Sequence, residues 1–197
     1  MKQGLMDRFW RWYRLEAADW LLWLRRPAMA RSMFESVLRD HPQDAHALSC
    51  LAFLEAGQGN RITAVEHLQR AVSLNADDVR AHYNLAFMLQ ELNRHDEAVV
   101  SFERVLALKS DHDLAHYGKA LSLIALDRFD EAIPALKRNT ELQPMSPYGW
   151  YQLARIHHAR GRKEKAEKVI RHLATFDPKV ARQLVRETGI QVETASF

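Results

Sequence analysis

The sequence contains few of the residues on which covalent frameworks and catalytic sites depend. Only one of its 197 residues is a cysteine, Cys50, so no disulfide can form within the chain and a reducing compartment fits. Glycine is scarce, at seven residues, and no glycine-rich loop suited to a phosphate is present. The HExxH pattern of zinc enzymes and the GxSxG pattern of serine hydrolases are absent. We therefore expect no enzyme activity, no cofactor and no metal centre.

Long hydrophobic runs are also missing. The most apolar segment, Leu5 to Leu24, is interrupted by Glu16 and Asp19, and Arg25-Arg26 separates it from the small residues that follow. It lacks the uninterrupted apolar run of a secretory signal, and it is too short and too charged to span a bilayer. We expect it to form a helix. The chain is expected to be cytoplasmic or, as an alternative, peripheral at the inner face of a membrane.

Composition and charge point to a globular protein with basic ends. Hydrophobic residues make up 47% of the chain and charged residues 27%, which excludes a disordered chain. Residues 1–31 hold seven Lys or Arg against three acids and residues 160–186 nine against three, whereas residues 32–159 hold twelve against seventeen. The basic cluster after residue 160 falls in a turn and helix that would be solvated anyway. Without an element that reads bases it gives only non-specific affinity, so we do not expect nucleic acid as a partner.

A period of 34 residues organises the chain. The segment Val79 to His112 has two amphipathic halves separated by the polar break Asn93 to Asp96, which predicts a helical hairpin. Residues 45–78, 113–146 and 147–180 align with it without an insertion. The alignment produces a column of alanines and a column of large apolar residues, namely Ala64, Ala98, Ala132 and Ala166, and Leu68, Phe102, Leu136 and Ile170.

These columns resemble the tetratricopeptide repeat (TPR) family. Small residues suit the close crossing of two helices in a hairpin, and the first helices supply Ala52, Ala86, Ala120 and Ala154. The loops before the second helices carry residues that tolerate a left-handed backbone, namely Gly59, Asn93, Asp127 and Gly161. Lys119 departs from the family pattern, and Pro134 lies early in its helix, where we expect at most a local kink. The resemblance implies an all-α fold, a right-handed α-solenoid of stacked antiparallel helical hairpins.

The same register extends beyond the four clear repeats. One period upstream, Ala30, Phe34 and Val37 fall on the columns of a second helix, so residues 11–44 are interpreted as a degenerate first repeat. The expected layout is therefore a tryptophan-rich helix and degenerate repeat in residues 1–44, four repeats in 45–180, and a capping helix with a loose tail in 181–197. The capping helix itself is predicted over Lys179 to Thr188.

The N-terminal helix has apolar residues on two sides. Its core side is predicted to carry Ala17, Ala18 and Leu21. A second apolar face remains, made of Trp12, Leu15, Leu22 and Trp23. Three explanations stay open: Trp12 and Trp23 line the repeat groove or cap its end, the helix mediates self-association, or residues 5–24 contact a membrane peripherally.

The family resemblance also implies which residues face a binding groove. Certain positions of each TPR usually point to the inner surface, and here they are largely apolar and aromatic, as expected for a protein contact site. The predicted groove residues are Trp12, Trp23, Phe53, Tyr83, Asn84, Phe87, Tyr117, Leu121, Tyr148, Tyr151 and Arg155. As an alternative, these side chains pack against neighbouring repeats or against the N-terminal helix.

The resemblance favours a non-catalytic adaptor or scaffold for a partner protein. Of the positions that hold a chaperone's carboxylate-ended peptide in some TPR proteins, only Asn84 matches, so an amphipathic helix or an extended apolar segment is the expected ligand. The alternative function is a peripheral membrane-associated or self-associating assembly factor that uses the tryptophan-rich helix. His112 and His116 are one helical turn apart, but packing is expected for them rather than metal binding.

Overall fold

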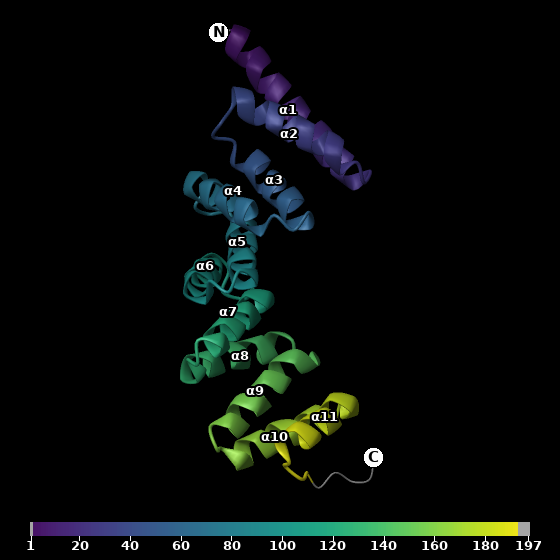
Figure 1. Ribbon diagram of the computed structural model, residues 1–197, viewed down its shortest axis with the longest axis vertical. Helices are drawn as coiled ribbons and strands as arrows, with labels where there is room; N and C mark the ends of the chain where they lie inside the picture. The colour runs from purple at the N-terminus through teal and green to yellow at the C-terminus, as the bar shows by residue number, and fades with distance from the viewer. Residues whose placement is uncertain (1, 193–197) are drawn as a thin grey trace. The chain divides into compact units, whose positions relative to one another are not determined.

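Eleven α-helices and no strand make up residues 2–192, the part of the chain that the computed structural model describes (Figure 1). The all-α prediction is confirmed. Residues 193–197 of the predicted loose tail lie outside the described range. The helices are α1 (Lys2–Trp23), α2 (Pro27–Asp40), α3 (Ala45–Gly57), α4 (Arg61–Leu74), α5 (Val79–Glu91), α6 (His95–Leu108), α7 (Asp113–Ala125), α8 (Phe129–Leu142), α9 (Pro147–Ala159), α10 (Lys163–Ala174) and α11 (Pro178–Thr188).

The helix boundaries repeat with the sequence period because the capping residues repeat. Asp44 and Asp78 each precede a first helix, and their side chains accept hydrogen bonds of 2.9 Å from the backbone N–H groups of Ala47 and Ala81. At the same place in the next repeat, Nδ1 of His112 accepts a 3.2 Å bond from the backbone of α7. Each cap satisfies a backbone N–H that the first turn of a helix leaves unpaired.

The turns inside the hairpins share one backbone conformation. Gly59, Asn93, Asp127 and Gly161 have φ between 56° and 83°, which is the left-handed region. Arg25, one period before Gly59, has the same conformation with φ of 56°. The degenerate first repeat therefore turns like the others, although arginine is less suited to this conformation than glycine or asparagine.

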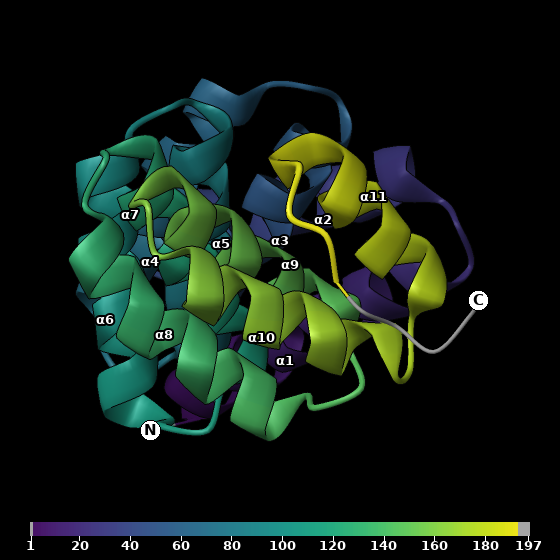
Figure 2. The same cartoon turned by 90° about the horizontal axis from the view of Figure 1, so that it is seen from below.

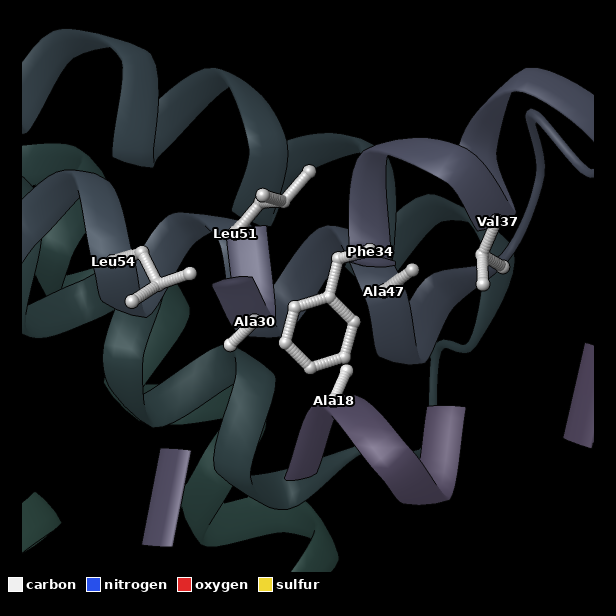
Figure 3. Packing of buried hydrophobic residues seen from close by; sticks show 7 residues of the cluster. All are labelled: Ala18, Ala30, Phe34, Val37, Ala47, Leu51 and Leu54. Atoms are coloured by element: carbon white, nitrogen blue, oxygen red, sulfur yellow. The ribbon is translucent and has the colours of Figure 1, made fainter. Parts of the chain in front are cut away.

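The chain divides into two compact units, residues 1–101 and 102–197. In the first unit, each of the helices α1 to α4 packs on the next along the chain. Phe34 of α2 lies at the centre of its core, fully buried among Ala18 of α1, Val37 of α2 and Ala47 and Leu51 of α3 (Figure 3). Because these contacts join three helices, α1 is anchored to the repeats through its C-terminal half.

The second unit has its own core. Helix α11 packs against both α9 and α10, and the three helices lie side by side in Figure 2. Ala181 and Leu184 of α11 are buried with Ile170 and Leu173 of α10. Pro134 lies in the second turn of α8, and the helix continues through it to Leu142.

A close contact between α7 and a buried phenylalanine gives a sharp test of packing in the second unit. A Cβ added at Gly118 would lie 2.7 Å from Cε1 and 2.9 Å from Cε2 of Phe102, a ring that is fully buried. Overpacking of a core costs about 1–3 kcal/mol, while alanine in a helix returns up to about 1 kcal/mol relative to glycine. Gly118→Ala is therefore expected to lower the free energy of unfolding, measured by urea denaturation, by about 1–2 kcal/mol.

Gly57 provides the matched control for this substitution. It also lies in a helix, but an added Cβ there would meet no atom within 4 Å. Gly57→Ala is expected to leave stability unchanged or to raise it slightly. A Gly118→Ala variant as stable as Gly57→Ala would show that the Phe102 ring moves aside without cost.

Candidate functional site

Some of the predicted groove residues belong to the first unit and the others to the second. Trp12, Trp23, Phe53, Tyr83, Asn84 and Phe87 belong to the first unit, and Tyr117, Leu121, Tyr148, Tyr151 and Arg155 to the second. Tyr83 and Leu121 are half-buried within the helices that carry them. Trp12 and Trp23 are exposed on α1, and neither lines the cavities described below.

An apolar cavity of about 390 Å³ opens between helices of the first unit. Phe53 of α3 and Phe87 of α5 line it, and their side chains are 65% and 44% exposed. Asn84 also lines this space, which we call the Phe53/Phe87 cavity. Its remaining lining residues are Ala52, Ala56, Gly57, Arg61, Leu68, Met88 and Glu91. The three small residues of α3 leave the room that the cavity occupies.

Charges in the Phe53/Phe87 cavity neutralise one another. Nη2 of Arg61 lies 3.3 Å from Oε2 of Glu91, and both residues are among those lining the cavity. An exposed pair of this kind contributes little to stability. The Arg61 and Glu91 pair does supply one hydrogen-bond donor and one acceptor beside an otherwise apolar space. The cavity can therefore bind a ligand segment in which an apolar side chain is flanked by polar ones.

A second cavity of the first unit, about 470 Å³ in volume, shares Phe53 and Asn84 with the first but is lined by more polar and charged residues. Its other lining residues are Asp19, Leu22, His46, Ser49, Cys50 and Arg80. Oδ2 of Asp19 lies 2.9 Å from Nε2 of His46, and Sγ of Cys50 lies 3.7 Å from both Oδ1 of Asp19 and Nε2 of His46. Burial, reinforced by the Asp19 carboxylate, raises the pKa of the Cys50 thiol to about 12.

In the second unit the predicted groove residues form two contact pairs, Tyr117 with Tyr148 and Tyr151 with Arg155. The Tyr117 and Tyr148 ring centroids are 6.4 Å apart, and the Cζ atom of Arg155 lies 5.6 Å from the centroid of the Tyr151 ring. The hydroxyl of Tyr151 donates a 2.8 Å hydrogen bond to Glu187 of α11. Arg155 and Glu187 line a cavity of about 490 Å³.

These contacts affect the two half-buried phenols in the same direction. Burial raises the pKa of Tyr117, and burial together with the Glu187 carboxylate raises the pKa of Tyr151. Both phenols therefore remain neutral hydrogen-bond donors at physiological pH. Tyr148, in contrast, is largely exposed and available to a partner.

His112 and His116, which the sequence places one helical turn apart, have structural partners, as does His82. His112 caps α7 through Nδ1, and burial lowers the pKa of its ring, which favours the neutral form that such a cap requires. Nε2 of His116 lies 2.9 Å from the backbone oxygen of Ser110, and Nε2 of His82 lies 3.1 Å from that of Ala76. Among residues 2–192, the one group of three metal-ligating side chains is Asp19, His46 and Cys50.

Two sequence models described as tetratricopeptide repeat match the chain, one over residues 55–122 and the other over residues 117–181. The chain belongs to the tetratricopeptide repeat family. The match agrees with the 34-residue period and with the hairpins of the structure. No curated protein sequence matches the chain.

Solved structures confirm the TPR fold. YrrB, described as a TPR protein with an unusual peptide-binding site, matches with a TM-score of 0.82 at 16% identity, covering 88% of this chain and 90% of that chain. MamA matches with a TM-score of 0.80 at 19% identity, covering 88% and 94%. A MamA chain from Desulfovibrio magneticus RS-1 gives 0.74 at 17% identity, covering 90% and 96%. At these identities the likeness shows an all-α TPR solenoid.

The TPR register accounts for which predicted residues meet. Phe53 and Phe87 are 34 residues apart, so they occupy the same position in consecutive repeats and line one cavity. Arg61 and Met88 also line that cavity but were not predicted. The family resemblance implies groove positions on the first helix of each repeat only, whereas Arg61 lies on a second helix, α4. Met88 lies on a first helix, α5, but not at one of those positions. No TPR helix within residues 2–192 is long and apolar enough to cross a membrane.

Proposed function

We propose that this TPR protein is a non-catalytic adaptor that binds an apolar or amphipathic segment of a partner protein, with the Phe53/Phe87 cavity as the principal contact. The exposure of both phenylalanines beside one cavity carries the proposal. Large apolar side chains gathered around a depression are typical of protein contact sites, because covering them removes apolar surface from water. Aromatic anchors in pockets also dominate the binding energy of many interfaces.

The shape and charge of the cavity favour an amphipathic helix as its occupant. Such a helix would insert apolar side chains from one face between Phe53 and Phe87. The polar side chains that flank its apolar stripe would then meet the Asn84 amide and the Arg61 and Glu91 pair. The peptide-binding site named for YrrB, a protein of the same fold, supports a peptide segment as ligand.

Site-specific photo-crosslinking tests where the partner binds. A photoreactive phenylalanine analogue placed at Phe53 is expected to capture a defined partner protein from native lysate. The same analogue at Ile62 is the matched control, because Ile62 of α4 is 67% exposed and lines neither cavity of the first unit. Equal capture from the two positions would contradict a localised site and would indicate general apolar stickiness.

A second candidate function, self-association, rests on helix α1. Large apolar side chains remain exposed along this helix, namely Leu5, Met6, Phe9, Trp10, Trp12, Tyr13, Trp20 and Trp23. From Gly4 to Tyr13 every side chain of the helix is exposed. An isolated helical segment of this length is marginal in water, so a covering surface would stabilise it.

Charge favours a second copy of the chain over a membrane as that covering surface. Two arginines of α1 are engaged within the protein, since Arg11 lies 2.6 Å from Asp44 and Arg14 lies 2.7 Å from Asp40. They are therefore less available to anionic lipid headgroups. The basic N-terminal region and the acidic residues 32–159 carry opposite net charges, which suits a contact between the start of one chain and the middle of another.

Replacing two contacting tryptophans tests self-association. The Trp20 and Trp23 rings meet edge to face with centroids 5.6 Å apart, and both are exposed. The wild-type chain is expected to exceed monomer mass in light scattering at high concentration, and Trp20→Ala with Trp23→Ala is expected to be monomeric, whereas Ile62→Ala keeps the larger mass. A wild-type monomer at every concentration would contradict this candidate, and co-sedimentation with anionic vesicles would instead assign α1 to a membrane surface.

A further inference from the structure

The second cavity of the first unit, which Asp19, His46 and Cys50 line, brings three metal-ligating atoms together from two helices. His46 and Cys50 are four residues apart on α3, which places them on one face of that helix. Asp19 reaches the same point from α1. The carboxylate, the imidazole and the thiol each offer one ligand atom, and these atoms all lie within 4.8 Å of one another.

The spacing of these atoms matches one face of a tetrahedral zinc site. Zinc bonds of about 2.0 Å to oxygen and nitrogen and about 2.3 Å to sulfur place tetrahedral ligand atoms roughly 3.3–3.6 Å apart. Here Cys50 Sγ lies 3.7 Å from both His46 Nε2 and Asp19 Oδ1, close to this range, whereas the other carboxylate oxygen, Oδ2, lies nearer to His46 Nε2, at 2.9 Å. Small side-chain rotations would open the last distance and give a cation three ligands.

The geometry does not suit a catalytic cysteine. In a nucleophile relay, one imidazole nitrogen faces the nucleophile and the other faces the carboxylate that orients the ring. In this cluster the same atom, Nε2 of His46, faces both Asp19 and Cys50. Convergence of all three groups on one point is instead the arrangement that a bound cation requires.

Ser49 provides an independent sign that the cavity holds a ligand. Its side chain lines the same cavity and is only 8% exposed, and Oγ has no hydrogen-bond partner among the residues that the structure describes. A buried hydroxyl in that state is normally satisfied by a water or a ligand. Arg80 lines the cavity as well and can balance an anionic fourth ligand.

We propose that Asp19, His46 and Cys50 bind a single zinc ion, with a fourth coordination position open to the cavity that Ser49 and Arg80 line. Nitrogen and sulfur ligands together favour zinc over magnesium or calcium, which prefer oxygen. The bound ion ties α1 to α3 and thereby orders the tryptophan-rich helix. This proposal stands independently of the adaptor function.

Metal titration of the full-length chain tests the site. Zinc competition against a chromophoric chelator is expected to give one ion per chain, and Cys50→Ser, His46→Gln and Asp19→Asn are each expected to weaken binding by at least about tenfold. Cobalt substituted for zinc is expected to show a thiolate-to-cobalt charge-transfer band that Cys50→Ser abolishes. His116→Gln is the matched control. His116 lies four residues after His112, the same spacing as between His46 and Cys50, but helix α7 contains no cysteine.

Two results would overturn the zinc site. One is a cobalt spectrum of the wild-type chain without the charge-transfer band. The other is zinc affinity that Asp19→Asn and Cys50→Ser leave unchanged while His116→Gln lowers it, which would assign binding to surface histidines. Asp19 is partly exposed, and asparagine keeps its shape, so this variant remains folded and informative even if replacement of Cys50 disturbs the core. Circular dichroism of each variant verifies its helix content.

Discussion

Phe34→Ala is expected to lower the free energy of unfolding of the first three helices by about 3–5 kcal/mol, the range for removing a large aromatic side chain from a core. Phe34 is fully buried, and its ring fills the space between three alanines, Ala18, Ala30 and Ala47, which come from α1, α2 and α3 (Figure 3). Alanines cannot collapse into the space that the ring leaves. The resulting cavity would separate α1 from the helices that support it.

The protein carries its own reporter for this effect. Four of its five tryptophans, Trp10, Trp12, Trp20 and Trp23, lie in α1, so tryptophan fluorescence during urea unfolding mainly follows the N-terminal hairpin. Hydrogen exchange of residues 2–57 gives the same information segment by segment. Met29→Ala is the control, since Met29 is an exposed residue of α2.

Met29→Ala is expected to change stability by less than about 0.5 kcal/mol, as is usual for exposed positions. If Phe34→Ala and Met29→Ala unfold at the same urea concentration, the interpretation of Phe34 as the centre of this core is wrong. If Phe34→Ala speeds hydrogen exchange in α1 but leaves the protection of α2 and α3 unchanged, the ring stabilises mainly the contact of α1 with the other two helices.

The fold follows from the sequence because the repeat period fixes several features at once. Caps such as Asp44 and Asp78, and turn residues such as Asn93 and Asp127, recur at 34-residue intervals and set where each helix begins and ends. Even the degenerate repeat keeps the register, through a left-handed turn at Arg25. Because each repeat packs mainly on its neighbours, local signals suffice to predict the architecture.

The site was predictable only where it depends on the period. Phe53 and Phe87 line one cavity because equal positions of consecutive repeats are adjacent. The convergence of Asp19 with Cys50 depends on the orientation of α1 and on side-chain rotamers, which no period encodes. The spacing of four between His46 and Cys50 was the available signal, and it belongs to neither the HExxH nor the GxSxG pattern.

The N-terminal helix shows where pattern and structure diverge in detail. Its core contact falls on Ala18, which is fully buried, whereas Ala17 and Leu21 are only half-buried. The sequence does not specify what covers Trp12 and Trp23, because an apolar face has the same periodicity whether protein or membrane covers it. The cytoplasmic location and the absence of enzyme activity stay predictions.

The most direct test of the adaptor proposal is the affinity of the purified crosslinked partner for two double variants of this protein. Phe53→Ala with Phe87→Ala removes both aromatic walls of the cavity, whereas Ile62→Ala with Val100→Ala removes side chains that are 67% and 65% exposed and line neither cavity of the first unit. Because aromatic anchors contribute about 1–2 kcal/mol or more each, the first variant is expected to bind roughly 100-fold more weakly than wild type.

Isothermal titration calorimetry measures the affinities, and circular dichroism establishes that both variants keep their helices. The proposal predicts that the variant of Ile62 and Val100 binds like the wild type while the variant of Phe53 and Phe87 loses about two orders of magnitude in affinity. Equal affinities of the two double variants would contradict the Phe53/Phe87 cavity as the working surface of this TPR protein.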